Sequence, residues 1–131
     1  MLGELIYEGS GKRNVRRVVS IDPVQLEVTF EGSGKMHGLD VMEIGTYHTM
    51  IRSDGTLYGE GQGVIMSADG DLVTWKGTGT GSVKAGTVSY RGSISYHTAS
   101  PKLARLNTVA GVFEFESGQD GSTQAKVWEW K

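Results

Sequence analysis

The chain has 131 residues, enough for one domain, and we do not expect a second hydrophobic core. Its 20 glycines and only 2 prolines exclude a proline-rich linker, and the absence of cysteine excludes disulfides, thiolate nucleophiles and cysteine-held metals. A net charge of −2 favours neither a nucleic-acid nor an acidic-membrane partner. No apolar run is long enough to span a membrane, and Met1 to Ser10 lacks a secretory signal pattern, so we expect a cytoplasmic location.

Apolar and polar residues alternate along most of the chain, which is typical of β-strands. In chain order, the expected strands span residues 3–9, 13–20, 24–32, 40–53, 56–67, 71–80, 86–98, 109–117 and 123–131. The total is eight or nine strands, because the first two segments can form one bent strand. A single short helix is expected from Pro101 to Asn107, since Ser100 can cap it and proline suits a first helical position.

Three Asp-Gly pairs separate alternating segments: Asp54-Gly55, Asp69-Gly70 and Asp120-Gly121. Asp-Gly provides the positive φ angles of tight hairpins, so these pairs predict neighbouring antiparallel strands in a meander. The last alternating segment is expected to pair with the first, because closure removes exposed sheet edges. We therefore predict an all-β protein. Residues 1–131 should form a single closed antiparallel β-barrel of about eight strands, mostly a meander, with minimal helix.

Glycine recurs at every second position in two strands, at 59, 61 and 63 and again at 77, 79 and 81. A phosphate-binding loop is not indicated, because neither a helix pattern nor a Lys-Ser/Thr pair follows. Glycines at strand spacing instead leave room for large side chains such as Trp75, Tyr90 and Tyr96. If the glycines face inward, Tyr58, Glu60 and Gln62 face outward. In the opposite register Glu60 and Gln62 line the interior, and the sequence leaves both registers open.

Few residues have the spacing of a catalytic or metal site. The histidines, His37, His48 and His97, lack metal-ligand spacing, so we expect no metal and no cofactor. Glu43 or Glu60 could be a buried general acid or base, although a solvated glutamate on a strand is the commoner case. The basic cluster Lys12–Arg17 could contact phosphates, but it better fits an exposed edge that discourages aggregation. No nucleic-acid partner is expected.

Several segments together carry a family resemblance. They are GEGQGVIMSADGD from Gly59 to Asp71, VTWKGTG from Val73 to Gly79, Tyr90–Ser93, Gly111–Glu114 and Val127–Trp130. Over residues 24–131 the chain resembles small uncharacterised bacterial proteins with an allene-oxide-cyclase-like barrel. The resemblance implies the barrel fold. It also favours a homo-oligomer, a dimer or trimer, to which an outward Trp128 and Trp130 would contribute. No catalytic residue of the cyclase maps onto a matching motif here.

Three functions remain open for such a barrel: binding a small apolar or amphipathic ligand inside it, a cyclase or isomerase activity, or a structural role with a packed interior. The mixed polarity of strands 40–53, 56–67 and 86–98 favours the first, because a wall that only bounds a core would be cleanly apolar on one face. These strands provide the candidate ligand-binding residues: Tyr47, His48, Tyr58, Glu60, Arg91 and His97. No catalytic residue is assigned.

Overall fold

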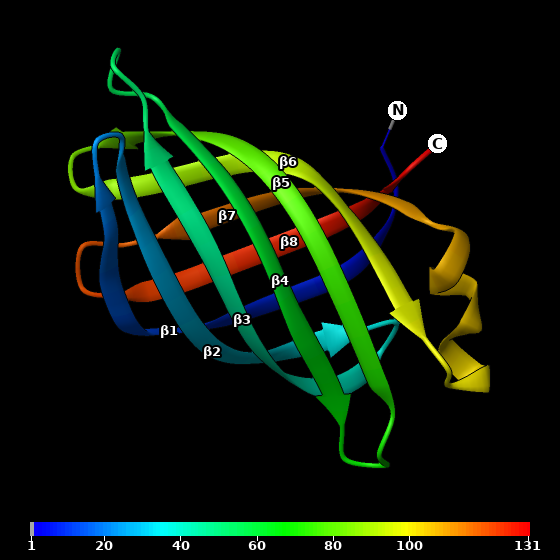
Figure 1. The fold of residues 1–131 in the computed structure, drawn as a ribbon. Helices are drawn as coiled ribbons and strands as arrows, with labels where there is room; N and C mark the ends of the chain where they lie inside the picture. Colours follow the sequence, from blue (N-terminus) through cyan, green and yellow to red (C-terminus); the bar gives the residue numbers. More distant parts are fainter. Residues whose placement is uncertain (1) are drawn as a thin grey trace.

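The computed structural model describes residues 2–131, which form eight antiparallel strands closed into one barrel (Figure 1). The strands are β1 (Leu2–Ile21), β2 (Val24–Met36), β3 (Leu39–Ile51), β4 (Leu57–Ser67), β5 (Leu72–Lys84), β6 (Thr87–Thr98), β7 (Ala110–Ser117) and β8 (Ser122–Trp130). A 3₁₀ helix, η1 (Pro101–Thr108), connects β6 to β7. Each strand pairs with the next and β8 pairs with β1, which confirms the predicted meander barrel. Segments 3–9 and 13–20 belong to one long strand, β1.

Glycine forms the hairpin turns where the sequence placed them. Gly55, Gly70 and Gly121 of the three Asp-Gly pairs all have φ near +90° (+87°, +91° and +89°). Besides the turn at Asp22-Pro23 between β1 and β2, two further hairpins had no Asp-Gly signal, and each has glycine as its second residue: His37-Gly38 and Ala85-Gly86. In these turns both central residues have positive φ, the backbone of a type I′ turn, with a non-glycine residue in the first position.

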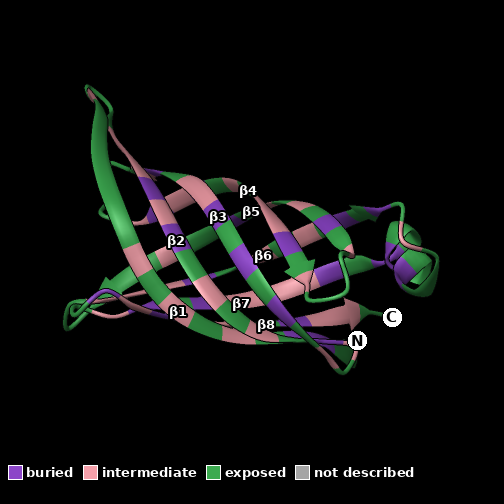
Figure 2. Ribbon diagram, turned by 90° about the horizontal axis from the view of Figure 1, so that it is seen from below, coloured by how far each residue is buried: buried purple, intermediate pink, exposed green. Residues whose placement is uncertain are grey.

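Side chains alternate between the inside and the outside of the barrel, and Figure 2 shows this as bands of buried and exposed residues along the strands. The structure has the glycine face of β4 inward, so Tyr58, Glu60 and Gln62 face outward. Trp75 packs over two such glycines: a Cβ on Gly63 would lie 2.5 Å from its ring, and one on Gly45 2.8 Å. The interpretation of the glycines as space for large rings is confirmed.

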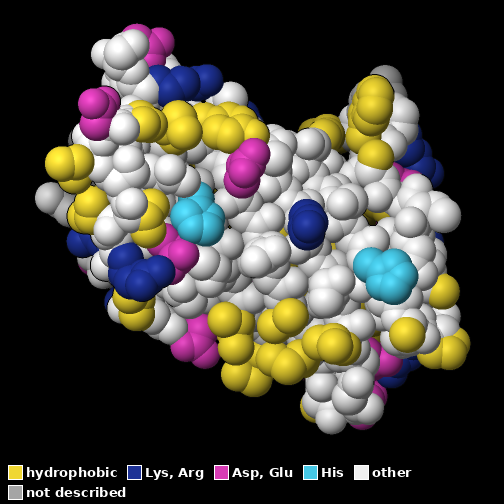
Figure 3. Space-filling view, in the orientation of Figure 1, with side chains coloured by type: hydrophobic (Ala, Val, Ile, Leu, Met, Phe, Trp, Pro, Cys, Tyr) yellow, Lys and Arg dark blue, Asp and Glu magenta, His cyan; other side chains and the backbone are white. Residues whose placement is uncertain are grey.

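The outer face of β3, β4 and β5 has hydrophobic side chains among its polar ones. Met42 on β3 lies opposite Met66 on β4, which in turn lies opposite Leu72 on β5. All three are exposed, and Figure 3 shows hydrophobic side chains gathered in a band across this face. Trp130, at the end of β8, is also exposed. These surfaces favour self-association, and the dimer or trimer stays a prediction.

Helix η1 closes one end of the barrel. Its two leucines, Leu103 and Leu106, are buried in a cluster with inward residues from most strands, among them Ile6, Met36 and Val73. This packing gives the closed end a continuous apolar core. Within residues 2–131 no helix is long and apolar enough to cross a membrane, and the cytoplasmic location stays a prediction.

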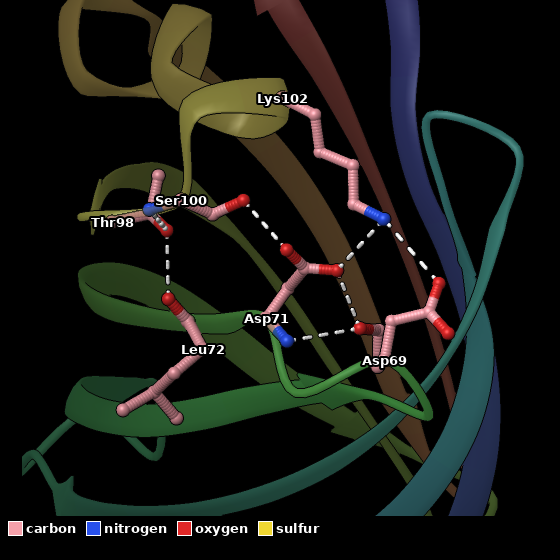
Figure 4. Close-up of polar contacts among 7 residues, drawn as sticks. Asp69, Asp71, Leu72, Thr98, Ser100 and Lys102 are labelled. Atoms are coloured by element: carbon pink, nitrogen blue, oxygen red, sulfur yellow. Dashed lines mark hydrogen bonds and ion pairs between the residues drawn. The ribbon is translucent and has the colours of Figure 1, made fainter.

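A polar clasp attaches the start of η1 to the turn between β4 and β5 (Figure 4). The carboxylate of Asp71 accepts hydrogen bonds of 2.6 Å from the hydroxyls of Ser100 and Ser67. It also lies 3.2 Å from Nζ of Lys102. The hydrogen bonds from Ser100 and Ser67, together with the Lys102 charge, lower the pKa of Asp71 to about 2. The clasp therefore persists at any ordinary pH and holds η1 over the barrel end.

Candidate functional site

The barrel interior contains a cavity of about 80 Å³. Aromatic rings form much of its wall, and the centroids of Phe30, Tyr47 and Phe115 lie 5.2 to 6.2 Å from one another. At these separations aromatic rings attract each other, and Tyr47 meets Phe115 edge to face while the other two pairs are tilted. The glycines at 59, 61, 77 and 79 form another part of the wall with backbone alone. The cavity is thus the space that glycine leaves free in a ring-lined barrel.

One buried acid lines this cavity. Glu43 is 7% exposed and is the only Asp or Glu that is buried among residues 2–131. It faces inward because it shares a face of β3 with Gly45 and Tyr47. The hydroxyl of Tyr7, on β1, donates a hydrogen bond of 2.9 Å to Oε1 of Glu43. A carboxyl group is therefore held in an apolar interior with one hydrogen-bond donor.

Burial determines how Glu43 titrates. Removal from water raises its pKa from 4.5 to about 7, and the nearby Tyr7 hydroxyl and Trp75 indole oppose that rise only in part. Burial and the adjacent carboxylate also raise the pKa of Tyr7. Tyr96 is buried beside them, and burial together with Glu43 and Tyr7 raises its pKa well above the usual value. Near neutral pH Glu43 is shared between its acid and its carboxylate form, while both tyrosines stay protonated.

The indole N–H of Trp75 is a buried donor with no hydrogen-bond partner among residues 2–131. It lies near enough to Glu43 to favour the carboxylate form, but it makes no hydrogen bond of standard geometry. A buried donor left without a partner costs about 1–3 kcal/mol. Because Trp75 lines the cavity, an acceptor atom inside the cavity could satisfy this donor.

The structure separates the six predicted ligand-binding residues. Tyr47 lines the cavity, and Glu60 also borders it, although its side chain faces outward. The side chains of the other five lie on the outer surface of the barrel: His48, Tyr58, Glu60, Arg91 and His97. The role of all six as ligand-binding residues stays a prediction. Among their side chains, only that of Tyr47 points into the interior.

The outward residues pair with one another or with neighbouring strands. His48 Nε2 lies 3.1 Å from a carboxylate oxygen of Glu27, and the Tyr58 hydroxyl donates a 2.8 Å hydrogen bond to Glu60. Arg91 forms an ion pair with Glu114. His48 and Glu60 also border a depression on the outside of β3–β6 that continues over the end of η1 and the start of β7. Over residues 2–131, no three His, Asp or Glu side chains are grouped as a metal site would require.

Sequence reasoning considered Glu43 only as a possible acid or base and missed its neighbours Tyr7, Trp75 and Tyr96 as a group. The four residues come from β1, β3, β5 and β6, so no sequence spacing relates them. The useful signal was local: Glu43 shares a strand face with Gly45 and Tyr47. Once the glycine faces are known to point inward, that face must carry Glu43 into the barrel.

No protein-family model and no curated protein matches the chain. Solved structures of other proteins do match it. A protein of unknown function from Clostridium acetobutylicum has a TM-score of 0.84 at 13% identity, with 96% of each chain covered. A "beta-barrel like protein" from Acinetobacter baumannii has a TM-score of 0.83 at 15% identity, covering 98% of this chain and 94% of that one. An enzyme from Penicillium herquei has a TM-score of 0.69 at 15% identity, covering 96% and 92%.

At these identities the matches establish a shared fold only. They support the part of the resemblance that concerns uncharacterised bacterial β-barrel proteins. None of these three proteins is described as an allene oxide cyclase. The chain therefore has the barrel of bacterial proteins whose function is unknown.

Proposed function

We propose that the barrel binds a small apolar or amphipathic molecule in its interior cavity. The observation that carries this proposal is the unpartnered indole N–H of Trp75 in the cavity wall. A ligand atom that accepts this hydrogen bond would remove the cost of the orphaned donor. A hydroxyl on the ligand could accept from Trp75 and donate to the Glu43 carboxylate at the same time.

The cavity's size and walls define the ligand further. Its volume of about 80 Å³ is about half of the roughly 150 Å³ in which benzene binds. The ligand body would therefore extend from the polar cluster towards the barrel end opposite η1. The rings of Phe30, Tyr47 and Phe115 favour an aromatic or flat apolar body, since rings gain from edge-to-face contact.

Calorimetric titration with tyrosol, a neutral phenol with a hydroxyethyl arm, tests the proposal. Wild-type protein should bind tyrosol, and Trp75→Phe should weaken binding about tenfold through loss of the N–H. Ala125→Leu should weaken it as much or more, because Ala125 lines the cavity and leucine would fill it. The matched control is Ala104→Leu, the same change at an exposed position of η1, which should bind as wild type does.

Absence of tyrosol binding to the wild type at millimolar concentration would contradict the proposal. Equal binding by the wild type and the folded Ala125→Leu variant would also contradict it, since the ligand would then lie elsewhere. Thermal unfolding of each variant establishes that it is folded.

A second candidate is an acid–base enzyme of the isomerase or cyclase type, and the pKa of Glu43 favours it. With a pKa of about 7, Glu43 has both protonation states available near neutral pH, as a general acid or base requires. The allene-oxide-cyclase resemblance and the fold shared with a fungal enzyme agree with this candidate without supplying a substrate. In this function Glu43 would transfer a proton to or from a ligand held by Trp75.

Substrate trapping distinguishes the two functions. Glu43→Gln keeps the size of the side chain and its acceptor for Tyr7 but cannot transfer a proton. Native mass spectrometry of protein purified from cells should then find a compound on Glu43→Gln that the wild type converts and does not retain. If both proteins carry the same compound in the same amount, the enzyme candidate is wrong and simple binding stands.

A further inference from the structure

Two arginines of the basic cluster face the inside of the barrel because of an irregularity in β1. Arg13 lies opposite Phe30 and Arg16 opposite Val28, with a register shift between Arg13 and Val15. In a regular strand, residues three positions apart face opposite sides. The extra residue of a bulge brings them to the same side. Since Phe30 and Val28 are buried inward residues, Arg13 and Arg16 share the inner face of β1.

Neither arginine has an acidic partner. In residues 2–131 no Asp or Glu oxygen lies within 4.0 Å of the guanidinium of Arg13 or Arg16. Their neighbour Arg17 faces outward and pairs with Glu27 at 2.9 Å. Arg13 is half-buried and held in place, since its Nη1 donates a 2.8 Å hydrogen bond to the buried hydroxyl of Ser117. The inner face thus carries two positive charges that the chain itself leaves uncompensated.

These charges stand at the rim of the aromatic cavity. Phe30, opposite Arg13, lines the cavity, and so does Tyr47. Burial and the neighbouring Tyr90 raise the pKa of Tyr47, while the charges of Arg13 and Arg16 oppose that rise, as nearby cations do. Arg13 and Arg16 lie towards the end of β1, near the turn to β2. Helix η1 packs against the other end of the barrel, so this rim is at the end opposite η1. The cavity therefore has a cationic rim at one end and the Glu43 cluster nearer the other.

We propose that Arg13 and Arg16 bind the anionic group of an aromatic ligand whose ring lies against the wall formed by Phe30, Tyr47 and Phe115. This inference rests on the proposed binding function and names the class of ligand. A guanidinium pairs with an anionic oxygen group through two parallel N–H bonds, and the half-buried setting of Arg13 strengthens that attraction. A ring with a hydroxyl at one end and an anion at the other would satisfy Trp75 and the rim together.

Two probes with the same ring test the charge at the rim. Tyrosol and para-hydroxyphenylacetate share a phenol and differ in ending with a neutral hydroxyl or a carboxylate. Calorimetry on the wild type should show the carboxylate bound about tenfold more tightly than tyrosol. Added salt should reduce that preference, because screening weakens charge pairing.

The arginine variants locate the effect. Arg16→Gln and Arg13→Gln should each reduce the preference for the carboxylate several-fold, because they should weaken the binding of the carboxylate more than the binding of tyrosol. Arg17→Gln is the matched control, since Arg17 lies on the same strand but faces outward, and it should keep the full preference. Arg16 is exposed and makes no described side-chain hydrogen bond, so its variant should fold even if Arg13→Gln loses the bond to Ser117.

The outcomes separate this inference from the proposed function. Tyrosol binding with no preference for the carboxylate would overturn the anion site and leave interior binding intact. Equal loss of preference in Arg16→Gln and Arg17→Gln would also overturn it, because the effect would then be one of general surface charge. Binding of neither probe would overturn both proposals.

Discussion

Replacing Glu43 by Gln should make the stability of the barrel less dependent on pH. In the folded protein burial raises the pKa of Glu43 from 4.5 to about 7, whereas in the unfolded chain the group is in water. Between these pH values the folded state therefore binds more protons than the unfolded state. Stability from the protonated group is fully present below pH 4.5 and is lost as the pH rises to about 7.

The size of this effect follows from the shift. Each pKa unit corresponds to about 1.4 kcal/mol. The rise of Glu43 from 4.5 to about 7 therefore makes the wild type lose about 3 kcal/mol of unfolding free energy across that interval. Solvent screening removes little of this, because the side chain is almost fully buried. In Glu43→Gln the glutamine does not titrate over this pH interval. The free energy of unfolding of the wild type, minus that of the variant, should therefore fall by the same amount as the pH rises.

Urea unfolding followed by tryptophan fluorescence measures both proteins from pH 4.5 to pH 7. Glu116→Gln is the matched control, since Glu116 is an exposed carboxylate on the outside of β7, and this variant keeps Glu43 and so keeps the pH dependence that comes from it. A flat difference for Glu43→Gln would refute the reasoning. It would mean that water or relaxation solvates the Glu43 carboxylate inside the barrel.

Three other changes test neighbouring parts of the structure. Tyr7→Phe removes a donor that lowers the pKa of Glu43, so the midpoint of the Glu43 titration should rise, as carboxyl carbon NMR can measure. Gly92→Ala should destabilise the barrel by about 1–3 kcal/mol in urea unfolding, because the new Cβ would collide with the backbone oxygen of Thr78; wild-type stability would contradict this. Leu106→Ala should cost about 2–5 kcal/mol, since this fully buried side chain fills the closed end; a cost below about 1 kcal/mol would mean that the end is loosely packed.

The sequence predicted the barrel well because its signals were local. Period-two alternation identified every strand, and the Asp-Gly pairs identified three of the hairpins. The turns at His37-Gly38 and Ala85-Gly86 lacked that dipeptide and required a non-glycine residue at positive φ, which no short-range rule anticipates. The choice between the two registers of β4 depended on what lies across the barrel, and here Trp75 decided it by requiring Gly63 beneath its ring.

The candidate site was harder to predict because it depends on sides of strands and on long-range neighbours. His48 and Glu60 were chosen for their chemistry, but one residue of register places each of them outside. Glu43 and Trp75 gain their properties only when four separate strands enclose them. Arg13 and Arg16 would lie on opposite faces of a regular strand, and only the bulge between Arg13 and Val15 brings them to the same face.

The pairing of β8 with β1 has a consequence for how quickly the barrel folds. Seven of the eight strand pairings join consecutive strands, so each closes over a turn or, between β6 and β7, over helix η1. The eighth joins Leu2 to Trp130 and brings together the two ends of the chain. Its entropic cost must be met before its contacts form, which is the feature that slows folding in proteins of high contact order. Closing the ring should therefore be the slow step, with the edges of β1 and β8 unpaired until it is complete.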